Sequence, residues 1–430
     1  DLKNQAAAKE VDPSLMDRAM RTLEKEGVNQ NQNPDLLIPR PYYYDKDGNY
    51  QEAEWEVEEN KLILSIKTTK DKYPLSVDPT LSFTAPGVSN GGVVIESAEG
   101  GLFGRHIAVG DLNADGKTDL VVGATSYSAG GRAYIFYNDG QYSTAASSAD
   151  VIITSEASGN NFGRTPATGD LNADGKTDLI VGASGYSSST GRAYIFYNGS
   201  ITTENASGAD VVITGEASSS LGNNATGDLN ADGRTDLVLR GGGVQRIYIF
   251  YNDGSIPTTA ATADVIIDGE ASSNLGFALT TGDLNADGRT DLVAGAYSYS
   301  SSAGRVYVFY NDGSYPTTAV TADVIITGDS TNRFGWVLET GDFNTDGRVD
   351  LVTSADLGNK AYIFYSQNGV LNTNRSIAGE TTGNFFGSTF AVGDLNADGR
   401  TDLVITAPSY SSSTGRAYIF YNDGSIPTTA

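Results

Sequence analysis

Short apolar runs separated by Gly, Asn, Asp and Ser recur through most of the chain. Runs such as DLVVGA, RAYIFYN and ADVIIT are rich in Val, Ile, Tyr and Phe. This composition is typical of β-strands bounded by turns. Several runs are apolar at consecutive positions rather than alternating, which indicates strands covered on both faces. The pattern therefore predicts an all-β fold whose sheets pack face to face.

The apolar runs recur with a period that defines six repeats. The string GDLNADGKTDL begins at Gly110 and returns, with small changes, at Gly169, Gly227, Gly282, Gly341 and Gly393. Its first Asp recurs at intervals of 59, 58, 55, 59 and 52 residues. Each period holds four strand signals: one before the acidic string, one after it, one of the RAYIFYN type and one of the ADVIIT type. The string YNDG at Tyr137, Tyr251, Tyr310 and Tyr421 predicts a tight hairpin turn between the third and fourth strands. A period of this length with four strands predicts the blade of a β-propeller.

The order of the strands predicts how the ring closes. The last repeat stops at SIPTTA, where other repeats continue into ADVIIT, and a run of that missing type, GVVIESAE, stands at 92–99. We therefore predict that this N-terminal strand completes the last blade and closes a six-bladed ring without a free edge. One alternative is a seventh blade built from the divergent segment before residue 100. Another is a native chain that continues past Ala430.

Residues 1–79 lie outside the repeats and predict a small α+β segment. The stretch VDPSLMDRAMRTLEKEG at 11–27 has the pattern of a helix that is capped by Asp12 and ends at Gly27. Short strands joined by turns are expected to follow it. We interpret this segment as the end of an upstream domain. The predicted domains are therefore 1–79 and a propeller at 80–430.

Charge and composition exclude several classes of function. The chain has 53 acidic and 28 basic residues and a net charge of −25. A chain with this negative charge is repelled by the phosphates of nucleic acid and by anionic membrane surfaces. It has no Cys, which excludes disulfides and thiolate zinc sites and favours a microbial source. No apolar run approaches the roughly 18 residues of a membrane span, so we expect no direct membrane insertion.

The acidic strings carry the clearest chemistry. Each one has the pattern D-x-N-x-D-G-x-x-D, in which side chains at positions 1, 3, 5 and 9 and the carbonyl of position 7 can converge on one cation. Gly at position 6 permits the sharp turn that an oxygen cage needs. Oxygen donors without His or Cys select Ca²⁺ over zinc or copper, and Mg²⁺ prefers to keep its waters. The alternative is six solvated polar turns, which would not need the same residues in all six copies.

The sequence therefore predicts about six structural Ca²⁺ sites. Ca²⁺ sites with the weak affinity of extracellular modules need millimolar calcium, which places the protein outside the cell or on its surface. The predicted donors, repeat by repeat, are Asp111, Asn113, Asp115, Lys117 and Asp119; Asp170, Asn172, Asp174, Lys176 and Asp178; Asp228, Asn230, Asp232, Arg234 and Asp236; Asp283, Asn285, Asp287, Arg289 and Asp291; Asp342, Asn344, Asp346, Arg348 and Asp350; and Asp394, Asn396, Asp398, Arg400 and Asp402.

These repeats resemble the FG-GAP repeats of integrin α-subunit β-propellers and their bacterial relatives. The FG element stands at Phe103-Gly104, Phe162-Gly163, Phe334-Gly335 and Phe386-Gly387, and the GAP element at Gly123-Ala124, Gly182-Ala183, Gly295-Ala296 and Ala407-Pro408. The resemblance covers roughly residues 80–430. It implies that the metal loops are structural and that ligands bind on the opposite face. Integrin propellers have seven blades with calcium loops in only some, whereas this chain has six units that all carry a loop, so six and seven blades both stay open.

The loops after the GA element are the predicted ligand face. They carry a Tyr at a fixed offset, followed by Ser-rich stretches, and by strand direction they lie opposite the acidic loops. Exposed Tyr beside Ser can stack on sugars or anchor a protein partner. The alternative is that these Tyr pack between blades. The candidate ligand-binding residues are Tyr127, Tyr186, Tyr299 and Tyr410.

The sequence favours a binding protein over an enzyme. The only His is His106, beside the FG element, and no nucleophile–base pair stands out. We therefore predict a secreted or cell-surface Ca²⁺-binding propeller that acts in adhesion or ligand binding, with an extracellular protein or carbohydrate as partner. One alternative is a structural component of an extracellular appendage or filament, assembled into a larger surface structure. Another is a non-catalytic accessory domain of a larger enzyme.

Overall fold

The chain divides into two units, Asp1–Val94 and Ile95–Ala430. The computed structural model describes residues 95–98 and 101–430 apart from 141, 204, 330, 368–369, 397 and 414, together with the backbone of seven short strands between residues 36 and 83. The predicted helix at 11–27 lies outside the described residues. The predicted division at residue 79 stays a prediction.

The first unit contains three small antiparallel sheets. One pairs β1 with β7, one orders β3-β2-β6, and one pairs β4 with β5. The strand bounds are β1 (Leu36–Leu37), β2 (Tyr42–Tyr44), β3 (Tyr50–Glu52), β4 (Glu54–Glu58), β5 (Lys61–Ser65), β6 (Ser76–Val77) and β7 (Ser82–Phe83).

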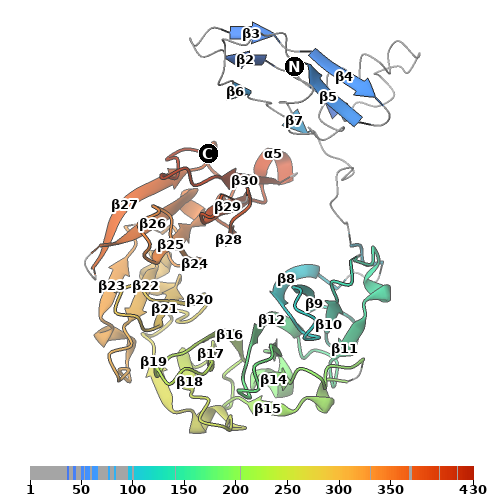
Figure 1. Cartoon of the computed structure of the whole chain (residues 1–430). Helices are drawn as coiled ribbons and strands as arrows, with labels where there is room; N and C mark the ends of the chain where they lie inside the picture. The colour runs from blue at the N-terminus through green and yellow to red at the C-terminus, as the bar shows by residue number, and fades with distance from the viewer. Residues whose placement is uncertain are drawn as a thin grey trace. The chain divides into compact units, whose positions relative to one another are not determined.

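The second unit is a six-bladed β-propeller, as the repeats predict. Each blade is one antiparallel sheet whose strands follow chain order, and the blades succeed one another along an arc from β8 to β30 (Figure 1). The first three blades are β8 (Phe103–Gly110), β9 (Asp119–Ala124), β10 (Arg132–Phe136) and β11 (Val151–Thr154); β12 (Phe162–Gly169), β13 (Asp178–Ala183), β14 (Arg192–Phe196) and β15 (Val211–Thr214); and β16 (Leu221–Gly227), β17 (Asp236–Gly241), β18 (Arg246–Phe250) and β19 (Val265–Asp268). The last three are β20 (Leu279–Gly282), β21 (Asp291–Ala296), β22 (Arg305–Phe309) and β23 (Val324–Thr327); β24 (Leu338–Gly341), β25 (Asp350–Ala355), β26 (Lys360–Gln367) and β27 (Val370–Ala378); and β28 (Phe390–Gly393), β29 (Asp402–Ala407) and β30 (Arg416–Phe420).

Short helical turns connect these strands. Four-residue helices follow the second strand in blades 2, 4 and 6, namely α3 (Tyr186–Ser189), α4 (Tyr299–Ser302) and α5 (Tyr410–Ser413). The 3-10 turns are η2 (Ala146–Ser148), η3 (Ala206–Gly208), η4 (Ala260–Thr262), η5 (Ala319–Thr321) and η6 (Asp356–Gly358). In blade 1 the third strand ends at Phe136 and the fourth begins at Val151, with η2 between them. The tight hairpin predicted from YNDG is therefore wrong: Asp-Gly turns the chain inside a longer connection.

The predicted closing strand at 92–99 is described only in part. Glu96 forms a parallel bridge with Ala145 of blade 1, and Thr154 at the end of β11 forms the same kind of bridge with Asn205 of blade 2. Glu96 therefore lies beside blade 1 in the same way that Thr154, at the end of the outer strand of blade 1, lies beside blade 2. Residues 92–94 lie outside the described residues. Their pairing with the three-stranded sheet of blade 6 stays a prediction.

The first and last blades keep apolar side chains exposed. Ile107 of β8 is 63% exposed and Ile419 of β30 is 53% exposed, whereas Val308, at the position in blade 4 that corresponds to Ile419, is fully buried. Each intermediate blade buries such side chains against its neighbours. The core therefore consists of layers between consecutive blades, such as the cluster of Val121 and Ile135 from blade 1 with Val181 and Tyr194 from blade 2. This arrangement explains the consecutive apolar positions, because all six residues of β13 are buried.

The Gly of the GA element marks the closest approach between blades. A Cβ on Gly295 would lie 2.1 Å from the carbonyl oxygen of Gly335 in the next blade, and a Cβ on Gly182 would lie 2.2 Å from that of Gly222. A backbone carbonyl cannot rotate away as a flexible side chain can. The repeated Gly is therefore required by contact between neighbouring blades.

We expect Gly295→Ala to destabilise the propeller by about 1–3 kcal/mol, the usual cost of overpacking. Urea unfolding at fixed Ca²⁺ measures this free energy. The matched control is Gly222→Ala, whose new Cβ would meet its nearest atom, Ser184 Cβ, at 3.3 Å. Equal stability of the two variants would contradict the conclusion that contact between blades requires Gly at position 295.

Candidate functional site

The six acidic loops join the first and second strands of each blade and share one hydrogen-bonded scaffold. In the first loop Asp111 accepts hydrogen bonds from the backbone N–H groups of Asp115 at 3.0 Å and Gly116 at 2.9 Å. The side-chain oxygen of Asn113 accepts from the same Asp115 N–H at 3.0 Å. The corresponding bonds recur in the other five loops. The side chains at positions 1 and 3 are thus brought together over one turn of backbone.

The Asp at position 9 lies in the interior of the propeller, unlike the residues at positions 1, 3 and 5. All six position-9 carboxylates are fully buried. In the first loop Asp119 accepts hydrogen bonds from the backbone N–H groups of Leu112 and Asn138, each at 2.8 Å. The corresponding bonds to Asp178, Asp236, Asp291, Asp350 and Asp402 are between 2.8 and 3.0 Å long. Position 9 therefore joins the acidic loop to the end of the third strand.

Burial next to other carboxylates raises the pKa of four of the position-9 Asp residues. Burial raises the pKa of Asp178, Asp236 and Asp291 to about 6 each, and backbone hydrogen bonds only partly offset it. The same causes raise the pKa of Asp350 to about 7. The loop carboxylates at positions 1 and 5 raise these pKa values further by repulsion. A bound cation would relieve that repulsion.

The residue types fit calcium, although the structure does not bring every predicted ligand together. Among the described residues of the propeller, no three Asp, Glu or His side chains already converge as a metal-binding group. The reason is that position 9 turns inward to its two N–H donors. Each carboxylate oxygen has a second lone pair, so these hydrogen bonds leave acceptor capacity for a cation. The scaffold of positions 1, 3 and 5 supplies the hard oxygen donors that Ca²⁺ prefers.

At four of the joints an Asn after the third strand clamps the acidic loop of the preceding blade, and the sequence analysis missed it. The side-chain amide of Asn198 donates to the carbonyl oxygen of Asp111 in the preceding blade at 3.1 Å. Asn422 makes the same bond to Asp342 at 3.0 Å. Asn252 and Asn311 reach the corresponding Asp at 3.4 and 3.5 Å. The signal was present as the Asn of FYN, which we assigned to a turn only. The acidic loops thus lie at the joints between blades.

The four predicted ligand-binding Tyr lie at the opposite end of the strands, half-buried, and each covers an arginine. The guanidinium of Arg192 lies 3.7 Å from the ring centroid of Tyr186, and that of Arg305 lies 3.6 Å from Tyr299. Tyr127 and Tyr410 cover Arg132 and Arg416 in the same way, each at 3.7 Å. These cation–π contacts use one face of each ring. The ligand-binding role of the Tyr stays a prediction.

Three arginines and the single His form a positive cluster at the FG end of the inner strands. Burial, followed by the charges of Arg164 and Arg105, lowers the pKa of His106 to about 4, so it is neutral at pH 7. Arg240 is buried at the position where blades 1, 2 and 4 have the Gly of the GA element, and burial lowers its pKa to about 10. Its guanidinium donates to the carbonyl of Leu275 at 3.0 Å. The sequence analysis gave these residues no role.

Comparison with known proteins agrees with the repeat pattern. FG-GAP repeats match residues 103–136, 162–196, 275–309 and 386–420. The four matched ranges contain the predicted GAP positions, and three of them contain the predicted FG positions Phe103-Gly104, Phe162-Gly163 and Phe386-Gly387. The fourth predicted FG position, Phe334-Gly335, lies in a repeat that is not matched.

The curated relatives are longer proteins. Phosphatidylinositol-glycan-specific phospholipase D of Mus musculus is 37% identical over 32% of this chain and 18% of its own length. Integrin alpha-6 of Gallus gallus is 31% identical over 37% of this chain and 16% of its own. This chain therefore spans less than a fifth of either relative.

Two solved structures match this chain with low TM-scores. The V. cholerae biofilm matrix protein Bap1 has a TM-score of 0.33 at 17% identity, covering 61% of this chain and 38% of its own. The exotype rhamnogalacturonan lyase YesX has a TM-score of 0.41 at 12% identity, covering 90% of this chain and 69% of its own.

None of the helices in the described part of the chain is long and apolar enough to cross a membrane.

Proposed function

Because this chain carries FG-GAP repeats in a six-bladed β-propeller, we propose that it is a secreted or cell-surface Ca²⁺-binding module that binds an extracellular protein or glycan. The observation that carries the proposal is the placement of six like acidic loops at the joints between blades. A cation in each of the four loops that have an Asn clamp would hold adjacent blades together through that clamp. The opposite end of the strands is then free to bind a ligand without disturbing the metal.

The relatives support this assignment at the level of the module. Integrin alpha-6 and phosphatidylinositol-glycan-specific phospholipase D are each similar to about a third of this chain. Since one of them is named as an enzyme, the likeness alone does not decide catalysis. We assign this propeller a non-catalytic role because the clustered Asp residues of the repeats are accounted for by the loop scaffold and no nucleophile–base pair stands out in the sequence.

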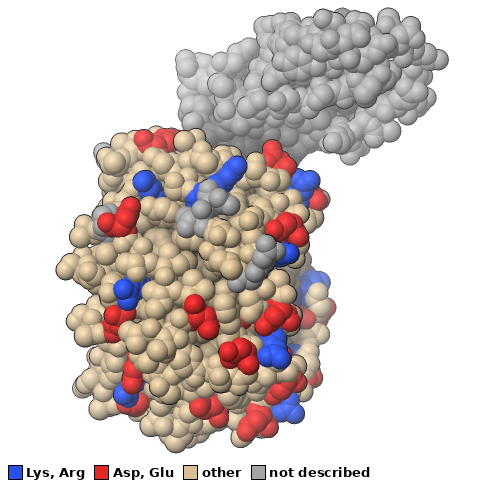
Figure 2. All heavy atoms as spheres, turned by 90° about the vertical axis from the view of Figure 1, so that its left-hand side faces the viewer, with Lys and Arg blue, Asp and Glu red and all other residues tan. Residues whose placement is uncertain are grey.

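The surface charge agrees with a ligand other than nucleic acid. On the face shown in Figure 2, Asp and Glu lie in small separate groups with Lys and Arg between them, and no broad basic patch appears on that face. Nucleic-acid binding needs a continuous positive surface that follows the phosphates.

We expect the protein to bind at least one member of a panel of extracellular matrix proteins and glycans, and to lose binding in chelator. Tyr186→Ala and Tyr299→Ala are expected to weaken binding about tenfold, the effect of removing an aromatic anchor. Plate binding with and without Ca²⁺ measures both effects.

The matched control is Tyr421→Ala, since Tyr421 is 52% exposed at the end of the blade that carries the acidic loop. Failure to bind any protein or glycan in the panel would overturn the proposal. Unchanged binding by both Tyr variants would move the ligand site elsewhere.

A further inference from the structure

The positive cluster of Arg105, His106, Arg164 and Arg240 lies at the end of the inner strands away from the acidic loops. The first strand of each blade lies on the inner side of the arc, and consecutive first strands lie against one another (Figure 1). Arg105 and Arg164 stand near the starts of the first strands β8 and β12. Arg240 stands near the end of β17, where it pairs with Asn223 at the start of β16. Three consecutive blades therefore bring their cationic side chains to one end of the arc.

The positive cluster lacks the carboxylate partners that other arginines of the propeller have. Five arginines elsewhere pair with Asp or Glu at 2.5–2.9 Å, namely Arg192, Arg246, Arg305, Arg333 and Arg416. Within the described residues, no ion pair joins Arg105, Arg164 or Arg240 to a carboxylate. Burial, and then the charge of Arg105, lowers the pKa of Arg164. The cluster is thus a local excess of positive charge in a chain whose net charge is −25.

Two guanidinium groups of the cluster keep N–H donors for a ligand. Arg164 donates from Nε to the side-chain oxygen of Asn223 at 3.0 Å, so one edge of its guanidinium is held by blade 3. The side chain of Arg105 is exposed and makes no hydrogen bond to a described residue. A guanidinium carries five N–H donors in a fork that matches a carboxylate. Arg105 and Arg164 can therefore each donate to an anion without breaking a contact of the fold.

Aromatic rings from blades 4 and 5 continue this end of the arc. The ring centroid of Phe277 lies 4.4 Å from that of Trp336 and 4.6 Å from that of Tyr297. All three side chains are partly exposed. The side-chain amide of Asn223 donates to the carbonyl oxygen of Phe277 at 2.8 Å, and the guanidinium of Arg240 lies 5.4 Å from the Phe277 ring centroid. The aromatic group of Phe277, Tyr297 and Trp336 therefore adjoins the positive cluster.

We propose that the positive cluster and the aromatic group together bind a glycan that carries carboxylate groups, one built from uronic acids. Guanidinium groups donate to a carboxylate at two points, and partly exposed aromatic rings accept the apolar face of a sugar ring. A uronic acid offers a carboxylate and a ring face in one residue, whereas an Asp or Glu of a protein offers the carboxylate alone. This inference rests on the proposed binding function and names the class of ligand.

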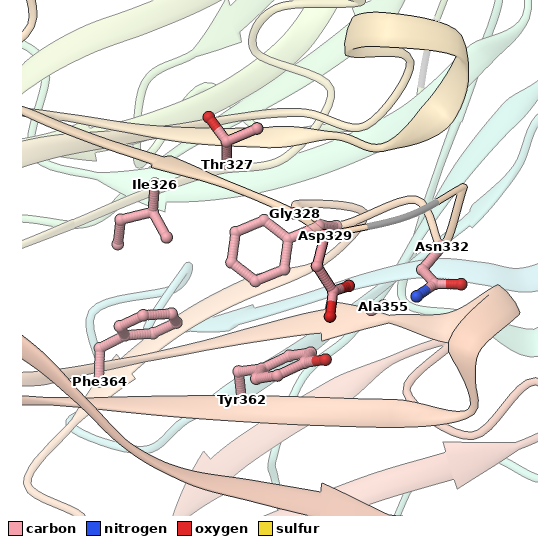
Figure 3. Close-up of a pocket in the computed structure, with 9 residues that line it drawn as sticks. Ile326, Thr327, Gly328, Asp329, Asn332, Ala355, Tyr362 and Phe364 are labelled. Atoms are coloured by element: carbon pink, nitrogen blue, oxygen red, sulfur yellow. The ribbon is translucent and has the colours of Figure 1, made fainter.

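The cavity at the joint of blades 4 and 5 is not part of this site. It has a volume of about 160 Å³, and Figure 3 shows the rings of Tyr362 and Phe364 along one wall. No arginine of the positive cluster and no ring of the aromatic group lines this cavity. Its volume is below the ~300–1,000 Å³ of sites for small organic ligands, so it is too small for an oligosaccharide.

The first test compares trigalacturonic acid with its neutral methyl ester by isothermal titration calorimetry on the whole chain. We expect the acid to bind at least about tenfold more tightly, because charge-assisted hydrogen bonds form only with the ionised carboxylate. Added NaCl should weaken binding of the acid more than binding of the ester. The blocked peptide acetyl-Glu-Glu-Glu-amide should bind more weakly than the acid, since it has no sugar ring.

Two outcomes of this comparison would overturn the proposal. One is equal affinity for the acid and the ester, and the other is tighter binding of the acidic peptide, which would indicate a protein ligand instead. If the chain still bound other members of the panel of matrix proteins and glycans, the proposed function would stand and only the class of ligand would be wrong.

Two variants test the side chains themselves. Arg105→Gln and Arg164→Gln are each expected to lower affinity for the acid at least about tenfold and to leave affinity for the ester unchanged. The matched control is Lys360→Gln, which removes one exposed positive charge at the start of the third strand of blade 5 and should leave both affinities unchanged. Because Arg105 is exposed, Arg105→Gln should also keep the urea midpoint of the native chain. Undiminished acid binding by both Arg variants would overturn the proposal.

The single His gives a spectroscopic measure of where the ligand binds. Burial and the charges of Arg164 and Arg105 lower the pKa of His106 to about 4. A bound carboxylate offsets those charges, so saturating trigalacturonic acid is expected to raise the pKa of His106, and the methyl ester is not. NMR of the imidazole between about pH 7 and about pH 5, where the ligand stays ionised, follows the change. An unchanged pKa of His106 at saturating acid would show that the ligand does not bind at the positive cluster.

Discussion

Removal of Ca²⁺ is expected to lower the melting temperature of the propeller by roughly 10–20 °C, more than any single substitution at the surface. The six loops contain three Asp each, so 18 carboxylates lie in tight groups at the joints between blades. At ~2 mM Ca²⁺ and a dissociation constant of ~0.1 mM, each site would add about 1.8 kcal/mol to the free energy of unfolding.

Six independent sites would then add about 11 kcal/mol as an upper bound, comparable to the whole stability of a typical domain. Repulsion among the carboxylates adds to the effect in chelator, because the Asp at positions 1 and 5 add to the burial that raises the pKa of Asp178, Asp236 and Asp291 to about 6. Calorimetry in EGTA, in Ca²⁺ and in Mg²⁺ measures the shift. Mg²⁺ should stabilise less, because it keeps its waters. An unchanged midpoint in EGTA would show that calcium does not hold the blades together.

The second large effect is expected at position 9 of the loops. We predict that Asp291→Ala costs about 3–5 kcal/mol in chelator as well as in Ca²⁺, because two buried N–H groups lose their acceptor. Asp291 is fully buried and accepts from the backbone of Leu284 at 2.8 Å and of Asn311 at 2.9 Å. Asn311 in turn reaches the loop of the preceding blade, so the loss extends across the joint.

Position 1 of the same loop supplies the comparison. Asp283 accepts hydrogen bonds in an exposed turn, so Asp283→Ala should cost less than Asp291→Ala when chelator is present. In Ca²⁺ it should lose a further ~1.8 kcal/mol, the contribution of one metal site. Urea unfolding of both variants in EGTA and in Ca²⁺ separates the two roles. If Asp283→Ala were the more damaging variant in EGTA, position 9 would not be the structural member of the loop.

Local patterns were enough for the repeats and the acidic loops. Strand, turn and loop signals lie within a few residues of one another, and the pattern D-x-N-x-D-G-x-x-D brings positions 1, 3 and 5 over one turn whatever surrounds it. The six blades, their strand order and the consecutive burial of β13 follow from the same short-range signals. The connection after the third strand was mispredicted, since an Asp-Gly pair predicts a turn but not the length of chain that follows it.

The sequence by itself thus determined the repeat, the blade and the local fold of the acidic loops. Only the tertiary structure decided how one blade meets the next. Asn198 reaches Asp111 across 87 residues, and Arg305 reaches Glu270 across 35. Such contacts depend on the register and spacing of separate sheets, which no local pattern encodes.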